Sequence, residues 1–128
     1  MSLRSPLGKV LGAGPAREGV RHWWMQRLSS VALVPLTIWF LVSLLALPSL
    51  DHAAVIAWIR QGPSALILVL LVLTAAWHSQ LGVRVVVEDY VHDSAARTLC
   101  LVILAFAHIG LVAVGVFAVL KVAFAAAA

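Results

Sequence analysis

Charge is scarce in this sequence. Asp, Glu, Lys and Arg make up 11% of its 128 residues, whereas soluble domains carry about 25%. Hydrophobic residues make up 63%, and the mean hydropathy is +1.06. A chain of this composition cannot cover itself with a charged, hydrated surface, which argues against a water-soluble globular domain. We therefore predict an all-α integral membrane protein.

Cysteine is almost absent as well. The single cysteine, Cys100, cannot form an internal disulfide and lies in an apolar run without Cys or His at metal-ligand spacing, so we interpret it as a packing residue. The chain has no dinucleotide-binding fingerprint and no cysteine set for an iron–sulfur cluster. The net charge of +4 does not indicate nucleic-acid binding, because the basic residues lie at the ends of apolar runs.

Three apolar runs are present, each long enough for the roughly 20 residues that a membrane helix needs. Pro48 ends the first run, which also contains Pro35, a position where a membrane helix tolerates a kink. Gly62-Pro63-Ser64 is typical of a helix start, and the short segment before it, with Asp51, is expected to be a loop. The predicted spans cover about 28–47, 64–86 and 98–124.

The segment 1–26 is rich in Gly, Pro, Ser and basic residues, a composition that cannot bury enough apolar surface to fold alone. We predict a basic N-terminal arm, followed by a three-helix membrane domain over 27–125. A cleaved signal peptide does not fit, because the polar lead is longer than a signal peptide allows and the run after it is long enough to span.

The positions of Lys and Arg predict the orientation. With three spans, the arm and the second loop lie on the same side of the membrane, and short cytoplasmic segments hold the excess of Lys and Arg. The other side has only Arg60 and Lys121. We therefore predict a cytoplasmic N-terminus, on the side that holds Arg4, Lys9, Arg17, Arg21, Arg27, Arg84 and Arg97.

Two histidines lie inside the predicted spans, where an ionisable side chain marks a functional site by default. His78 follows the longest apolar stretch of the second span, and His108 lies nearer the middle of the third. A neutral imidazole can bind haem iron through one nitrogen while the other donates a hydrogen bond. The alternative is a histidine bonded to a neighbouring helix. Gly82, on the same helical face as His78, leaves room for a flat ring or for another helix.

Three further residues could take part in chemistry at the cytoplasmic end. Asp89 follows His78 by eleven residues, which returns it to nearly the same helical face about 16 Å further along. Tyr90 could donate a hydrogen bond to a quinone carbonyl, or could be an interfacial tyrosine. Arg27 could pair with an anionic group such as a haem propionate, or could be a positive-inside charge.

The segment His78–Asp93, HSQLGVRVVVEDYVHD, resembles the smaller cytochrome b membrane anchor of succinate dehydrogenase (succinate:quinone oxidoreductase, complex II) of proteobacteria and mitochondria. That family has a His, a Gly four residues later, and an Asp-Tyr pair eleven and twelve residues after the His, a spacing that this segment matches. The segment His22–Leu36, HWWMQRLSSVALVPL, is similar to the start of the family's first span. Three spans and similar length extend the resemblance over nearly the whole chain.

The resemblance implies a function shared with other chains. His78 would be an axial ligand to the iron of haem b, opposite a His of the larger cytochrome b subunit. Tyr90 would hydrogen-bond ubiquinone, Asp89 would help to supply protons, and Arg27 would match the family's Arg near the haem propionates. The implied partners in a bacterial inner membrane are the larger cytochrome b anchor, an iron–sulfur subunit and a flavoprotein subunit. This chain would be a non-catalytic subunit.

Two other classes were weighed. A small channel or scaffold is less favoured, because no span has a run of polar residues or a Gly/Pro-interrupted pair of half-helices that would line a pore. A b-type cytochrome anchor of another quinone-linked complex would share His78 but would not need the Asp89-Tyr90 pair. Both succinate oxidation and fumarate reduction are compatible with the sequence.

Overall fold

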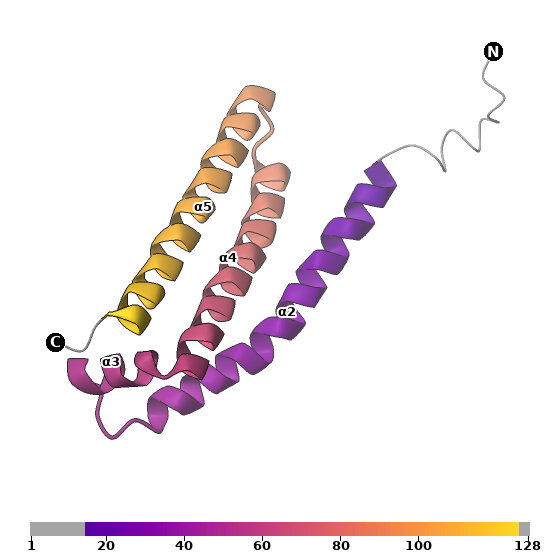
Figure 1. Ribbon diagram of the computed structural model, residues 1–128. Coiled ribbons are helices and arrows are strands. Elements are labelled where there is room, and N and C mark those ends of the chain that lie inside the picture. Colours follow the sequence, from indigo (N-terminus) through magenta and orange to yellow (C-terminus); the bar gives the residue numbers. More distant parts are fainter. Residues whose placement is uncertain (1–14, 126–128) are drawn as a thin grey trace, which may run out of the picture.

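The computed structural model describes residues 15–125, with side chains from residue 19 onward. Within this range the secondary structure is helical: α2 (Pro15–Leu45), α3 (His52–Arg60), α4 (Gly62–Tyr90) and α5 (Ser94–Phe124) (Figure 1). Three of these helices are long and apolar enough to cross a membrane, over Gly19–Leu45, Gly62–Tyr90 and Ser94–Phe124. This confirms the three predicted spans.

Helix α2 begins inside the segment predicted as an arm. Its first residue, Pro15, is favoured at the start of a helix because its φ is already helical and its missing N–H would have no partner there. The helix therefore extends well before residue 28, and it continues through Pro35 without a break. Arg4 and Lys9 of the predicted arm lie outside the described residues, as does the side chain of Arg17.

The first loop differs from the prediction, because most of it forms the short helix α3. The side chain of Asp51 caps this helix by accepting from the backbone N–H of Ala54 at 2.8 Å. The Ser49 hydroxyl donates to the Asp51 carboxylate at 2.7 Å, and this bond, with the cap, holds the pKa of Asp51 below its usual value. Trp58 of α3 is 7% exposed and stacks on Trp39 of α2, with 5.8 Å between the ring centroids.

Helix α4 lies between the other two long helices and packs against both α2 and α5 (Figure 1). The start of α2 and the turn from α4 to α5 lie at one end of the molecule, and α3 lies at the other. Helices α4 and α5 approach each other closely at Gly115, where an added Cβ would stand 2.9 Å from Val72 Cγ1. The absence of a side chain at Gly115 therefore allows the two helices to meet.

The polar segment after the second span remains helical up to Tyr90. With 29 residues, α4 is about 44 Å long, whereas the hydrocarbon core is about 30 Å thick. Its last turns therefore reach the membrane surface, where the Arg84 guanidinium pairs with the Glu88 carboxylate at 2.8 Å. Asp93 caps α5 by accepting from the N–H of Ala96 at 2.8 Å.

Most apolar side chains lie on the outside of this arrangement. In the most apolar 18-residue stretch of each span, 6% of the residues are buried in α2, 11% in α4 and none in α5. The few buried residues gather mainly on α4, where Ala65, Leu68 and Ala76 face the neighbouring helices. A surface of this kind is stable in contact with lipid or with the apolar helices of another subunit.

Candidate functional site between α2 and α4

His78 lies on α4 with its ring directed at α2. The ring is partly buried, and each of its nitrogens meets a side chain of α2: Nδ1 is 3.0 Å from Ser29 Oγ, and Nε2 is 3.4 Å from the amide nitrogen of Gln26. The second contact is long for a hydrogen bond, for which about 2.7–3.2 Å is usual. The imidazole is thus firmly held through Nδ1 and weakly held through Nε2.

The residues that meet His78 belong to one polar stripe on α2. His22, Gln26 and Ser29 are spaced at i, i+4 and i+7, which places them on one helical face. Two buried atoms of this stripe, His22 Nε2 and Gln26 Oε1, have no hydrogen-bond partner within the described residues. Buried polar groups are normally paired, so the stripe is a place where a further polar partner is expected.

Gly82 faces the same stripe. A Cβ added there would lie 3.6 Å from the amide nitrogen of Gln26, which is an ordinary contact distance. The sequence left open whether Gly82 makes room for a flat ring or for another helix, and in the structure it is helix α2 that lies next to Gly82. The distance does not by itself require glycine.

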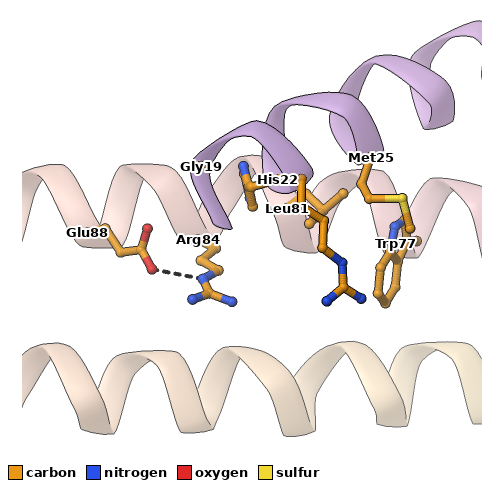
Figure 2. Close-up of a pocket in the computed structure, with 8 residues that line it drawn as sticks. Gly19, His22, Met25, Trp77, Leu81, Arg84 and Glu88 are labelled. Atoms are coloured by element: carbon orange, nitrogen blue, oxygen red, sulfur yellow. Dashed lines mark hydrogen bonds and ion pairs between the residues drawn. The ribbon is translucent and has the colours of Figure 1, made fainter. Parts of the chain in front are cut away.

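A cavity of about 570 Å³ lies beside the stripe, between the start of α2 and the second half of α4. In Figure 2, Trp77 and Leu81 of α4 lie opposite His22 and Met25 of α2, and the Arg84–Glu88 pair borders one end. Arg21 also lines the cavity, which gives it a cationic character. From the sequence, Arg21 and Arg84 are only charges that set the orientation, and the cavity is not predicted.

The sequence contains a pattern that marks the α4 side of this cavity. Trp77, Leu81, Arg84 and Glu88 recur at helical spacing and share one face of α4. Their pairing with the start of α2 depends on how the two helices cross, which the spacing does not contain.

The structure does not bring Arg27 to His78. Its side chain is exposed, and the guanidinium carbon lies over the Trp23 ring, 5.4 Å from the centroid. Arg27 is next to Gln26 in sequence, but successive residues of a helix point about 100° apart. The arginine is therefore on the outer surface of α2, free to meet a group that comes from outside the chain.

Asp89 and Tyr90 lie at the very end of α4, and both are exposed, Tyr90 to 78%. They stand about 16–18 Å along the helix axis from His78 at 1.5 Å per residue. Within the described residues, no hydrogen bond or ion pair joins either one to His78. The three predicted residues therefore occupy two levels of one helix rather than a single pocket.

His108 has two partners within the chain. Its Nδ1–H donates to the carbonyl oxygen of Leu104 at 2.9 Å, and its Nε2 accepts from the Ser79 hydroxyl of α4 at 3.3 Å. Both ring nitrogens are thus used, and the contact with Ser79 joins α5 to α4. This is the helix-packing alternative that the sequence analysis had set against haem ligation.

The described residues contain no group of three or more His, Cys, Asp or Glu side chains able to hold a bare metal ion. A metal bound at His78 must therefore take its other ligands from a cofactor or from another chain. Together, the three spans and the polar site around His78 define a multi-pass helical membrane protein with a buried polar site between α2 and α4.

Comparison with known proteins identifies the family. Residues 1–126 match the family of succinate dehydrogenase/fumarate reductase transmembrane subunits, and the chain belongs to this family. It is 35% identical to the succinate dehydrogenase hydrophobic membrane anchor subunit of Rickettsia bellii (strain RML369-C), over 86% of this chain and 89% of that protein. It is 31% identical to the subunit of the same name from Paracoccus denitrificans, over 67% of each chain. It is 24% identical to the succinate dehydrogenase membrane anchor subunit of Reclinomonas americana, over 70% of this chain and 77% of that protein.

Proposed function

We propose that this chain, a membrane anchor subunit of the succinate dehydrogenase/fumarate reductase family, supplies one axial ligand to a haem b shared with a larger cytochrome b subunit, and forms part of a ubiquinone-reduction site. The observation that carries the proposal is the state of His78. Its imidazole lies between two spans with one nitrogen held by Ser29 at 3.0 Å and the other in a 3.4 Å contact that a stronger ligand can replace.

The residues around His78 fit such a cofactor. His78 would supply one protein ligand to the iron, and the porphyrin and another chain would supply the rest, so one histidine in this chain would be enough. The buried atoms without partners, His22 Nε2 and Gln26 Oε1, lie on the α2 stripe that faces His78. When bound, haem b supplies a one-electron Fe(III)/Fe(II) couple. His78 holds the iron from this chain's side, and the apolar helices around it exclude water.

Arg27 is proposed to pair with a haem propionate. In this structure its cation lies over Trp23, an interaction of about 0.5–1 kcal/mol at an exposed site. An exposed ion pair contributes about 0–1 kcal/mol, so a carboxylate arriving from outside the chain can replace the aromatic contact at little cost, and gains more where neighbouring subunits exclude water. The exposure of Arg27 supports this role, because nothing within the chain has to be displaced except the contact with Trp23.

Tyr90 and Asp89 are proposed to act on ubiquinone near the membrane surface. The phenolic hydroxyl of Tyr90 donates a hydrogen bond to a quinone carbonyl, and the Asp89 carboxyl next to it passes protons from the aqueous side. Both side chains are exposed at the end of α4, where a pocket would be completed by other subunits. This position, beyond the apolar part of α4, suits a substrate that needs both lipid and water.

The partners follow from this placement. We propose that the N-terminus is cytoplasmic, so the start of α2 and the end of α4 face the cytoplasm of a bacterial inner membrane. An iron–sulfur subunit delivers electrons at this end, and a flavoprotein subunit oxidises succinate or reduces fumarate behind it. Of the basic residues that the structure describes, Arg21, Arg27, Arg84 and Arg97 lie at this end, which supports the orientation.

The haem role is tested by the reduced-minus-oxidised visible spectrum of the purified complex. His78→Ala is expected to abolish the low-spin b-type signal. His108→Ala is the matched control, since it removes an intramembrane imidazole that is already used within the chain, and it should retain the signal. A complex with His78→Ala that assembles with a normal spectrum would exclude His78 as the ligand.

The quinone role is tested separately. Tyr90→Phe removes one hydroxyl from an exposed ring and should leave assembly intact. We expect a loss of ubiquinone reduction with unchanged transfer of electrons from succinate to an artificial acceptor. An equal loss of both activities would contradict a role of Tyr90 at the quinone.

A further inference from the structure

We infer that Ser29 is the residue that prepares His78 for iron: its hydroxyl oxygen accepts the Nδ1–H of His78 and so leaves Nε2 without a proton. This inference rests on the proposed haem ligation and extends it to a positioning residue on the other helix.

The direction of the bond follows from the donors and acceptors present. The Ser29 hydroxyl has one hydrogen and donates it to the carbonyl oxygen of Gln26, so its oxygen is left to accept from His78 Nδ1, and Nε2 faces the amide nitrogen of Gln26 at 3.4 Å. A neutral imidazole carries one proton, which therefore resides on Nδ1. Ser29 Oγ, 3.0 Å away, accepts a hydrogen bond from Nδ1–H. Its own hydrogen points elsewhere, to the carbonyl oxygen of Gln26 at 3.0 Å.

The position of Ser29 makes this arrangement stable. The residue is 7% exposed, and its hydroxyl is tied to the backbone of its own helix. Rotating the hydroxyl away would leave Nδ1–H buried without a partner, and an unpaired buried donor is costly. The ring of His78 is thus fixed both in tautomer and in orientation by a residue 49 positions earlier in the chain.

Gln26 has a different part in the same arrangement. Its amide stands at the nitrogen that would bind iron, but it is poorly held there: the contact is long, and the amide oxygen is buried without a partner. The side chain has three rotatable bonds and can turn away without breaking another side-chain hydrogen bond. Gln26 therefore occupies the ligand position in the free chain and yields it to iron.

The hydrogen bond to Ser29 also tunes the iron. An imidazole that donates from Nδ1 is a more basic ligand, because negative charge builds up on the ring. A more basic axial ligand favours the ferric state and lowers the reduction potential of the haem. Removing the acceptor at Ser29 should therefore raise the potential, an effect that a loss of packing alone would not produce.

The test uses the purified complex with three variants of this chain. Ser29→Ala removes the acceptor, and Ser29→Thr keeps it. Ser30→Ala is the matched control, because the Ser30 hydroxyl also donates to the Gln26 carbonyl, at 2.8 Å, but does not reach His78. We expect a higher midpoint potential and faster loss of haem to apomyoglobin for Ser29→Ala, and wild-type values for Ser29→Thr and Ser30→Ala. Equal values for Ser29→Ala and Ser30→Ala would overturn the inference.

If Ser29→Ala prevents assembly, Ser29→Thr and Ser29→Val take its place, since their side chains have nearly the same shape and differ in the hydroxyl. A wild-type potential with Thr and a raised potential or no assembly with Val supports the role of the hydroxyl. Identical behaviour of the two, including failure to assemble, overturns it. His78→Ala separates the two proposals. If that variant keeps its haem, the proposed function itself fails. If His78→Ala loses haem while Ser29→Ala behaves like the wild type, only the role of Ser29 is rejected.

Discussion

The close approach of α4 and α5 at Gly115 makes a quantitative prediction about the helix that carries His78. In Gly115→Ala, the new Cβ would stand 2.9 Å from Val72 Cγ1, whereas carbon atoms in contact are about 3.5–4.0 Å apart. To reach that separation, the helices or the Val72 side chain must move apart from the new methyl group by about 0.6–1.1 Å. Overpacking of this kind costs about 1–3 kcal/mol.

The matched control is Gly110→Ala on the same helix, where an added Cβ meets nothing within 4 Å. Both variants gain the same helix propensity on replacing glycine, about 0.5–1 kcal/mol, so their difference isolates the clash. We expect Gly115→Ala to be less stable than Gly110→Ala by about 1–3 kcal/mol, or about 5- to 140-fold in the unfolding equilibrium. Adding Val72→Ala, which removes the two methyl groups, should restore most of the difference.

The assay is the fraction of complex that stays assembled after heating in mild detergent, followed by size-exclusion chromatography. Equal stability of the two glycine variants would refute the close approach. If Val72→Ala does not restore the stability of Gly115→Ala, the new methyl group clashes with a residue other than Val72, which would likewise contradict the geometry.

The remaining predictions concern the surface and the short helix. Arg27→Ala should weaken haem retention in the purified complex, because the propionate is proposed to lie at the outer face of α2. A larger effect of Arg21→Ala would indicate that the propionate lies in the cavity that Arg21 lines. Trp58→Ala should cost about 3–5 kcal/mol, measured as loss of assembled complex, because the ring is 7% exposed and packs on α2. The pKa of Asp51 is lowered in the folded chain, so the stabilisation from its cap is fully present above pH 3.8 and is lost as the pH falls through the pKa of the folded state. Hydrogen exchange of α3 should therefore become faster in acid. In Asp51→Asn, whose cap does not titrate, this acceleration should be absent.

The spans were predictable because they depend on local composition. Long apolar runs need lipid wherever they are placed, and Gly62-Pro63 favours a helix start in any context, so both features agree with the structure. The intramembrane position of His78 was predictable for the same reason. The helix α3 was missed although Asp51 stands at its N-cap, because a nine-residue helix between two spans has too weak a periodicity to distinguish it from a loop.

The partners of His78 could not be found in this way. Ser29 and Gln26 precede it by 49 and 52 residues, and only the crossing of α2 and α4 brings them to its two nitrogens. The same crossing turns Arg27 outward, and the axial rise of α4 separates Asp89 from His78 although they share a helical face. Sequence alone determined that this chain spans a membrane and carries a histidine within it, because hydrophobicity is local. Tertiary structure decided which side chains meet the two nitrogens of that histidine, because hydrogen-bond partners depend on how the helices pack.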